Sequence, residues 1–140
     1  MAPTASIAGA TQISGRIVET GIHKLDKLGL YKSKSNIVCL GCAPIPPVHP
    51  NFTYAMARTN DAILYGGVAY YIVEYDDDEE LKQIVSKAPS KSSKTYGKPF
   101  YKIDTGFFAP AVLIVNNVKT GRVFKAGEIN AEALAKSLAL

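Results

Sequence analysis

The chain has 140 residues, of which 47% are hydrophobic and 20% are charged, and its formal net charge is +4. This length suffices for one domain with its own core, and the composition is that of a globular rather than a disordered protein. No apolar run approaches the roughly 18 residues that a membrane span needs, and the N-terminus lacks a signal-peptide pattern. We therefore expect a single cytoplasmic domain over residues 1–140, with no membrane partner.

The distribution of charge along the chain gives little information about binding partners. Residues 74–80 form an acidic block, which is typical of a solvated helix start, and a lysine-rich segment without acids follows it. A small positive excess suits an anionic ligand without requiring one. The lysine-rich segment has few aromatic residues and matches no nucleic-acid-binding module, so we expect no nucleic-acid partner. Its lysines are Lys87, Lys91, Lys94, Lys98 and Lys102.

The N-terminal segment Ala2–Leu28 has the longest helical pattern in the chain. At about 100° per residue, apolar and small residues share one face, and polar residues line the opposite face. Arg16 and Glu19, three positions apart, are neighbours on the polar face and within reach of a salt bridge. Any surface helix shows such a stripe, so the pattern alone predicts an exposed ion pair. The apolar face holds Ile7, Ala10, Ile13, Ile17, Gly21, Leu25 and Leu28, and the polar face holds Gln12, Arg16, Glu19 and His23.

After this segment, a short apolar run predicts a buried strand at Asn36–Leu40. Residues 43–50 contain four prolines and therefore form a stiff, extended connector. Residues 52–57 are expected to form one or two helical turns, and the apolar run Ala62–Tyr65 is expected to form a strand. Gly66–Gly67 then predicts a hairpin turn into a second strand at Val68–Tyr75.

The C-terminal part of the chain is expected to alternate helices and strands. Asp76–Asp78 caps a helix that runs to about Ala88. The apolar run Ala111–Val115 is typical of a strand in a covered sheet, and residues 119–121 turn it into a hairpin. Asn130 then caps a helix over residues 131–138. The fold class is α/β or α+β, with a mixed sheet of about four to six strands and about three helices.

The two cysteines form a single C-x-x-C motif at Cys39 and Cys42. A zinc site would need both cysteines and the only two histidines, His23 and His49, without a second metal-binding motif. A redox role needs a motif that opens a helix, whereas prolines follow this one. We therefore favour two reduced cysteines at the end of a buried strand and expect no metal site.

Several long strings of the sequence resemble one family, in the same order. They are APTASIAGATQISGRIVETGIHKL, CAPIPPV, AMARTNDAILYGG, YGKPF, FYKID, FAPA and AGEIN. On these strings the chain resembles the C-terminal half of methenyltetrahydromethanopterin cyclohydrolase. The resemblance implies a second α/β half on the N-terminal side, with the pterin pocket between the two halves. It also implies an internal deletion near Phe100, where two motifs that the family separates are joined directly.

The family resemblance also implies a reaction and a set of site residues. The family reversibly hydrolyses 5,10-methenyltetrahydromethanopterin to the 5-formyl compound without a metal or redox cofactor, so the tetrahydromethanopterin derivative is the substrate. Glu19 matches the catalytic acid/base and Arg16 the arginine that holds it. Gln12 shares the face of Arg16 and is a further candidate for substrate binding. Arg58, Thr59, Asn60 and Asp61 match a string that we assign to substrate binding, or alternatively to capping a strand and holding the proline-rich connector.

Partners and activity follow from the same resemblance. The family is trimeric, so we expect a homo-oligomer, or a separate N-terminal half as the partner. Lys98 and Lys102 are candidates for contact with the anionic tail of the substrate, or are simply solvated. The alternative function is a truncated, non-catalytic module that binds a pterin or another protein and needs an N-terminal half for activity.

Overall fold

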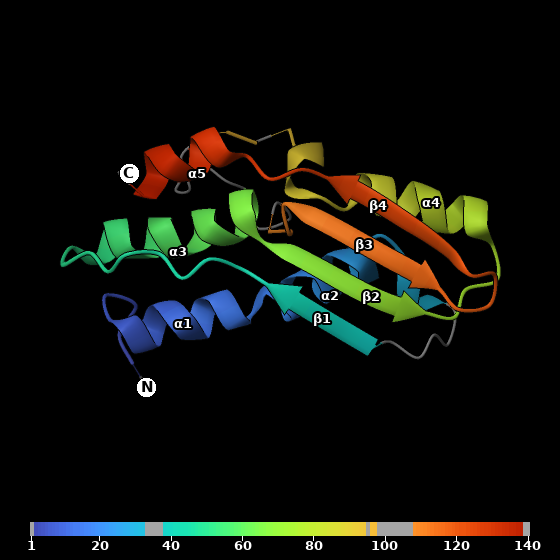
Figure 1. Ribbon diagram of the computed structural model, residues 1–140, viewed down its shortest axis with the longest axis horizontal. Helices are drawn as coiled ribbons and strands as arrows, with labels where there is room; N and C mark the ends of the chain where they lie inside the picture. Colours follow the sequence, from blue (N-terminus) through green and yellow to red (C-terminus); the bar gives the residue numbers. More distant parts are fainter. Residues whose placement is uncertain (1, 33–37, 95, 98–107, 139–140) are drawn as a thin grey trace.

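The computed structural model describes residues 2–32, 38–94, 96–97 and 108–138. Within these ranges the protein has five α-helices and one four-stranded sheet, which confirms the mixed α/β class (Figure 1). The count of about three helices was too low. The helices are α1 (Ile7–Gly15), α2 (Ile17–Lys27), α3 (Phe52–Gly66), α4 (Asp78–Lys87) and α5 (Ala131–Leu138), and the strands are β1 (Val38–Cys42), β2 (Val68–Val73), β3 (Val112–Asn117) and β4 (Arg122–Gly127).

The sheet has the strand order β1-β2-β3-β4 and mixes both kinds of pairing. The outer pairs β1/β2 and β3/β4 are antiparallel, whereas the central pair β2/β3 is parallel. The predicted hairpin from β3 to β4 is confirmed, with Asn117 opposite Arg122. The parallel pair aligns Tyr71 with Val115, so the buried side chains of both central strands point to the same face.

Helices α2 and α4 pack on that face, α2 against β1 and β2 and α4 against β3 and β4. Their apolar sides and the central strands form the core, to which Ile17, Leu25, Tyr71, Leu81 and Val115 contribute. Because side chains alternate along a strand, the intervening residues lie on the other face. There the side chains are mostly apolar and, apart from the buried Val112, exposed or half-buried, including Val38, Leu40, Tyr70, Ile72 and Ile114.

The other three helices lie side by side beyond the end of the sheet where β2 and β3 begin (Figure 1). Helix α3 occupies the middle and contacts both α1 and α5. One polar link joins α3 to α5, since the Ser137 hydroxyl donates to the Asp61 carboxylate at 2.5 Å. Asn130 caps α5 as predicted, because its side-chain oxygen accepts from the Ala133 amide at 2.9 Å.

The prediction of one N-terminal helix was wrong, because the helix breaks at Arg16. The backbone of Arg16 has φ −78° and ψ 2°, which ends α1 and begins α2. Gly15 precedes the break, and glycine is a poor helix former because it loses the most backbone entropy. Most of the predicted apolar face is buried or half-buried, but Ile7 is 73% exposed at the start of α1.

The prediction of a buried first strand was also wrong. Strand β1 is an edge strand with β2 as its partner, and Val38 and Leu40 are 58% and 63% exposed. Both cysteines are free, as expected, and burial raises the pKa of Cys39. Cys39 is half-buried whereas Cys42 is exposed. An apolar run alone did not distinguish a strand covered on both faces from one covered on a single face.

The largest correction concerns residues 52–67. The predicted strand at Ala62–Tyr65 and the hairpin at Gly66–Gly67 were wrong, because residues 52–66 form the single helix α3. Asn51 caps this helix, since its side-chain oxygen accepts from the Thr53 amide at 2.9 Å. Gly67 has φ −75°, so the glycine pair does not make a primed turn. Gly67 instead leaves space for the Ile17 side chain, because a Cβ on Gly67 would lie 2.4 Å from Ile17 Cδ1.

The prediction of a helix after the acidic block is confirmed. Asp77 caps α4, because its side-chain oxygen accepts from the backbone amides of Glu79 at 2.9 Å and Glu80 at 3.0 Å. The inner side of α4 buries Leu81, Ile84 and Val85, as the pattern predicted. The acidic first turn therefore stabilises the helix N-terminus.

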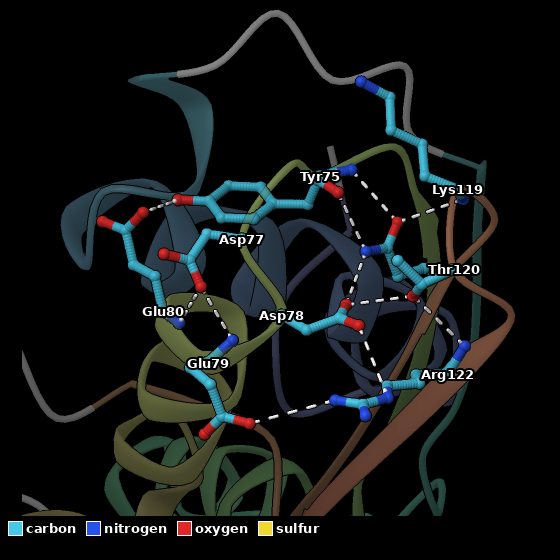
Figure 2. Close-up of polar contacts among 9 residues, drawn as sticks. Tyr75, Asp77, Asp78, Glu79, Glu80, Lys119, Thr120 and Arg122 are labelled. Atoms are coloured by element: carbon cyan, nitrogen blue, oxygen red, sulfur yellow. Dashed lines mark hydrogen bonds and ion pairs between the residues drawn. The ribbon is translucent and has the colours of Figure 1, made fainter.

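A polar cluster ties the start of α4 to the β3–β4 hairpin (Figure 2). Its centre is Asn117, whose side chain is fully buried. The Asn117 amide nitrogen donates to Asp78 at 2.8 Å, and the Thr120 hydroxyl donates to the same carboxylate at 3.0 Å. Nearby, burial and the hydrogen bond to Glu80 raise the pKa of Tyr75 to about 12. This cluster has a structural role, since it joins two segments that are distant in the sequence.

Replacing Gly21 by alanine should destabilise the protein. A Cβ at this position would lie 1.9 Å from the Tyr71 hydroxyl oxygen, which itself donates to the Val18 carbonyl at 2.9 Å. Helix α2 would have to move off β2, and we expect the free energy of unfolding to fall by about 1–3 kcal/mol. Urea denaturation measures this loss.

The control for this prediction is Gly15→Ala, since a Cβ there meets nothing within 4 Å. Alanine is a better helix former than glycine, so this change should leave the stability unchanged or raise it by less than about 1 kcal/mol. If Gly21→Ala and Gly15→Ala changed the free energy of unfolding equally, the close approach of α2 to β2 could not be the cause of the change.

Candidate functional site

A cavity of about 510 Å³ lies between the first two helices and α3. Three of the residues that the sequence selected line it together: Arg16, Glu19 and Asn60. The wall from α3 is mainly apolar, whereas the wall from the α1–α2 joint and α2 is mainly polar. The other lining residues are Thr4, Ile13, Thr20, His23, Met56, Ile63 and Phe108.

Arg16 and Glu19 form a two-point ion pair on this wall. The Arg16 Nε donates to Glu19 Oε2 at 3.1 Å, and its Nη2 donates to Oε1 at 2.9 Å. Such a pair fixes the direction of the carboxylate as well as its charge. Glu19 lies in the first turn of α2, where the helix dipole also favours a negative charge. The side chains are 55% and 66% exposed, so water reaches the carboxylate.

The ion pair sets the protonation of Glu19. Hydrogen bonds from Arg16, and then its positive charge, lower the pKa of Glu19 below its usual value, and His23 adds a smaller effect in the same direction. The carboxylate raises the pKa of Arg16 in return. Glu19 is therefore ionised at neutral pH and available to accept a proton.

Removing the guanidinium should raise the pKa of Glu19. In Arg16→Gln the hydrogen bonds and the charge that hold the pKa down are both lost, so Glu19 should take up its proton at a higher pH than in the wild type. The Arg16–Glu19 attraction is present above the ordinary carboxyl pKa and disappears as the pH falls through the lowered pKa. Carbon-13 NMR of the Glu19 carboxyl group measures the midpoint.

Arg122→Gln is the matched control for this titration, because Arg122 pairs with Asp78 and Glu79 in the polar cluster. It should leave the titration of Glu19 unchanged. An unchanged Glu19 midpoint in Arg16→Gln would contradict the cause given for the lowered pKa.

Asn60 differs from the other predicted residues of its segment. It lies inside α3, is 8% exposed and lines the cavity. Its neighbours point elsewhere. Arg58 donates to the Pro47 carbonyl at 3.4 Å, and Thr59 donates to the Met56 carbonyl at 2.9 Å. Arg58 therefore contacts the proline-rich connector, as the alternative interpretation of this string expected.

Asp61 and Gln12 do not line the cavity. Burial raises the pKa of Asp61, and the hydrogen bond from Ser137 partly opposes this. Gln12 is exposed on α1. Since the segment holding Asp61 is helical, the expected role in capping a strand does not apply to it. Lys98, Lys102 and the junction at Phe100 lie outside the described residues.

Sequence reasoning missed several residues of the cavity. His23 was placed on the polar face and considered only as a ligand of a zinc site that we did not favour. The spacing of four between Glu19 and His23 could have drawn attention to it. Met56, Asn60 and Ile63 share one face of α3, at spacings of four and three. This face was not recognised, because part of the segment was predicted to be a strand rather than a helix. Thr4, Thr20 and Phe108 gave no signal in the sequence.

Among the residues with described positions, no group of three or more His, Cys, Asp or Glu side chains could hold a metal ion. In the same part of the chain, every helix is too short or too polar to cross a membrane.

Comparison with known proteins identifies the family. A model of the cyclohydrolase (MCH) family matches residues 1–138. A methenyltetrahydromethanopterin cyclohydrolase from Methanothermobacter marburgensis is 42% identical over 151 residues, which cover 100% of this chain and 47% of that protein. Relatives of the same name are 42% identical in Methanocaldococcus jannaschii and 45% identical in Methanococcoides burtonii, and they cover 99% and 100% of this chain and 46% and 47% of their own lengths.

The chain thus spans about half the length of the relatives it matches. The aligned stretch of 151 residues is longer than the 140-residue chain, so the relative carries residues within it that have no counterpart here. The partial coverage of the relatives and the longer aligned stretch both agree with the expected resemblance to one half of the family, with an internal deletion. The family model, however, matches residues 1–138 of the 140, and the chain therefore belongs to the cyclohydrolase (MCH) family.

Proposed function

We propose that the protein takes part in the reversible hydrolysis of 5,10-methenyltetrahydromethanopterin to 5-formyltetrahydromethanopterin. The observation that carries this proposal is the two-point Arg16–Glu19 ion pair on the wall of a cavity. The relatives are named for an activity on this substrate, and they align with the whole of the chain. Hydrolysis of an amidinium-like carbon requires a group that moves protons, and an oriented carboxylate is suited to this role.

In the proposed reaction, water adds to the bridging carbon of the cationic substrate. Glu19 accepts a proton from this water, and the carboxylate has already stabilised the cation by its charge. Glu19 then gives the proton to the nitrogen that leaves as the carbon–nitrogen bond breaks. The hydroxyl proton of the intermediate passes to solvent, and the carbon remains as the formyl group on the other nitrogen. Overall, one water is consumed and one proton is released, with no change in oxidation state.

Arg16 serves this reaction as a positioning residue. Its two hydrogen bonds hold both carboxylate oxygens and so fix the orientation of the carboxylate on the cavity wall. Asn60 is our candidate for contact with the substrate ring, because it lines the same cavity. We assign Arg58 to contact with the proline-rich connector and Asp61 to contact with α5. The Thr59 hydroxyl is bonded within α3 itself, and Gln12, which is exposed on α1, is assigned no contact.

A second candidate function is a pterin-binding module that is inactive alone. The exposure of Glu19 favours it, because 66% of the side chain is open to solvent and a wet site weakens the electrostatic effect of the carboxylate. In this case a further polypeptide would cover the cavity. The partner is either a second copy of the chain or a counterpart of the half of the relatives that has no match here.

The experiment follows the loss of the methenyl absorbance after the purified chain is added. The chain is tested alone and together with the unmatched half of the Methanothermobacter marburgensis relative. Turnover by the chain alone supports the enzymatic proposal, and turnover only in the mixture supports the module that needs a partner. No turnover in either sample, together with no binding of the substrate, would refute both.

A further inference from the structure

The cavity has few side chains that can exchange a proton. Among the described residues that line it, the ionisable side chains are those of Arg16, Glu19 and His23. The lining residues from α1, from α3 and around Thr4 and Phe108 carry no ionisable group. A guanidinium stays protonated in proteins, and Glu19 already moves one proton in the proposed reaction. Of these described lining residues, His23 is therefore the one that can move a second proton.

His23 lies close to Glu19 and at the border between the cavity and solvent. It follows Glu19 by four positions on α2, a spacing that brings the Cβ atoms of two helical residues to within roughly 5–6 Å. The side chain lines the cavity and is also exposed. Histidine is the side chain that takes up and releases protons near neutral pH. A proton accepted by His23 in the cavity can thus leave directly to bulk water.

The proposed hydrolysis releases a proton for which no acceptor has yet been named. Glu19 takes one proton from the attacking water and gives it to the leaving nitrogen. The tetrahedral intermediate still carries a hydroxyl group on the bridging carbon, and this hydroxyl must lose its proton to become the formyl oxygen. A base near the carboxylate speeds up such a step, because it removes the proton as the carbon–nitrogen bond breaks.

We propose that His23 is the catalytic base that takes up this second proton. As the carbon–nitrogen bond breaks, its electron pair goes to the nitrogen that Glu19 has protonated. The electron pair of the O–H bond forms the second carbon–oxygen bond of the formyl group, and a neutral His23 ring nitrogen accepts the proton. The imidazolium then releases the proton to solvent. In the reverse reaction His23 gives it to the formyl oxygen. This inference rests on the proposed function and adds the second proton acceptor.

The charge of His23 links the two proton transfers. Hydrogen bonds and charge from Arg16 are the main causes that lower the pKa of Glu19, and the charge of His23 lowers it further. A proton on His23 therefore favours the ionised form of Glu19. The carboxylic acid then gives its own proton more readily to the leaving nitrogen. Uptake of one proton by His23 and release of the other by Glu19 thus support each other.

Rescue of His23→Ala by a small base tests this role. In whichever sample the wild type is active, the variant should turn over roughly tenfold more slowly or worse, because water is a poorer proton acceptor than imidazole. Alanine is a good helix former and the replaced side chain is exposed, so the variant should fold. Added imidazole should restore the rate in proportion to its concentration. Pyrazole has the same size but is a far weaker base, and it should restore nothing.

His49→Ala is the matched control, because His49 does not line the cavity. Its Nδ1 accepts from the Asn51 amide at 3.0 Å in front of α3. This variant should keep the wild-type rate and should not respond to imidazole. The loss of methenyl absorbance gives all of these rates, and circular dichroism checks the fold of both variants.

A second measurement does not depend on turnover. His23→Gln should raise the pKa of Glu19, but by less than Arg16→Gln does, since Arg16 is the larger cause of the lowered value. Carbon-13 NMR of the Glu19 carboxyl group measures this change. An unchanged Glu19 midpoint, an unchanged rate in His23→Ala, or equal rescue by imidazole and pyrazole would each overturn the inference. If the wild type is active, only the role of His23 is then lost. If the wild type is inactive in every sample, the proposed function fails, and the role of His23 fails with it.

Discussion

Glu19→Gln should reduce the turnover of methenyltetrahydromethanopterin by at least about a hundredfold, in whichever sample the wild type is active. Glutamine keeps the size of the side chain but cannot accept and return a proton. It also removes the negative charge that attracts the cationic substrate. The variant should fold normally, because the side chain is exposed and its ion pair with Arg16 lies at the surface. The loss of methenyl absorbance with time gives the rate.

The control for this substitution is Glu132→Gln, on the exposed first turn of α5 and not among the residues that line the cavity. It makes the same chemical change and should leave the rate unchanged. If the Glu19→Gln variant turned over the substrate at the wild-type rate, Glu19 would have no part in the mechanism. The Arg16–Glu19 pair would then be an ordinary surface ion pair. A similar loss in both variants would indicate a general effect of charge.

Asn117→Ala should lower the free energy of unfolding by about 3 kcal/mol or more. The Asn117 side chain is fully buried, accepts from the Tyr75 amide at 3.1 Å and donates to the Tyr75 carbonyl at 2.9 Å. It also donates to Asp78 at 2.8 Å. Alanine would leave the buried amide and carbonyl of Tyr75 without this partner, whereas Asp78 would keep its hydrogen bond from Thr120. Urea denaturation followed by circular dichroism measures the loss.

The neighbouring residue provides the control for this prediction. Asn116 is on the other face of β3 and is half-buried, so Asn116→Ala should cost less than about 1 kcal/mol. If both substitutions had the same small effect, the polar cluster would not hold the turn before α4 to the hairpin. If both had the same large effect, the cause would be the strand itself rather than the hydrogen bonds of Asn117.

The Arg16–Glu19 pair could be predicted because it depends on local geometry. Residues three positions apart meet on any helical turn, and the break at Arg16 leaves this turn intact because it forms the start of α2. The break itself could not be predicted, since an apolar stripe continues across two helices when both pack on the same core. Capping was also predictable, as Asp77 and Asn130 each accept a backbone amide within three residues.

The wall of the cavity from α3 could not be predicted. The run Ala62–Tyr65 is buried on every side, because α3 lies between α1 and α5, and such a run has no amphipathic period that separates helix from strand. The surroundings of Asn60 depend on this packing of distant segments. The strand at β1 was predicted, but its position at the exposed edge was not, because strand order is a property of the whole sheet.

The pairing of strands in the sheet has a consequence for the order of folding. Strands β3 and β4 form a hairpin with a short turn, a local structure of the kind that forms within microseconds. Strands β2 and β3 pair in parallel, and the Asn117 side chain reaches Tyr75 across 42 positions of the chain. Closing this long loop costs entropy before any contact compensates for it, so parallel pairing is slow. We therefore expect the hairpin to form first and β2 to dock on it, with the Asn117 hydrogen bonds forming after that step.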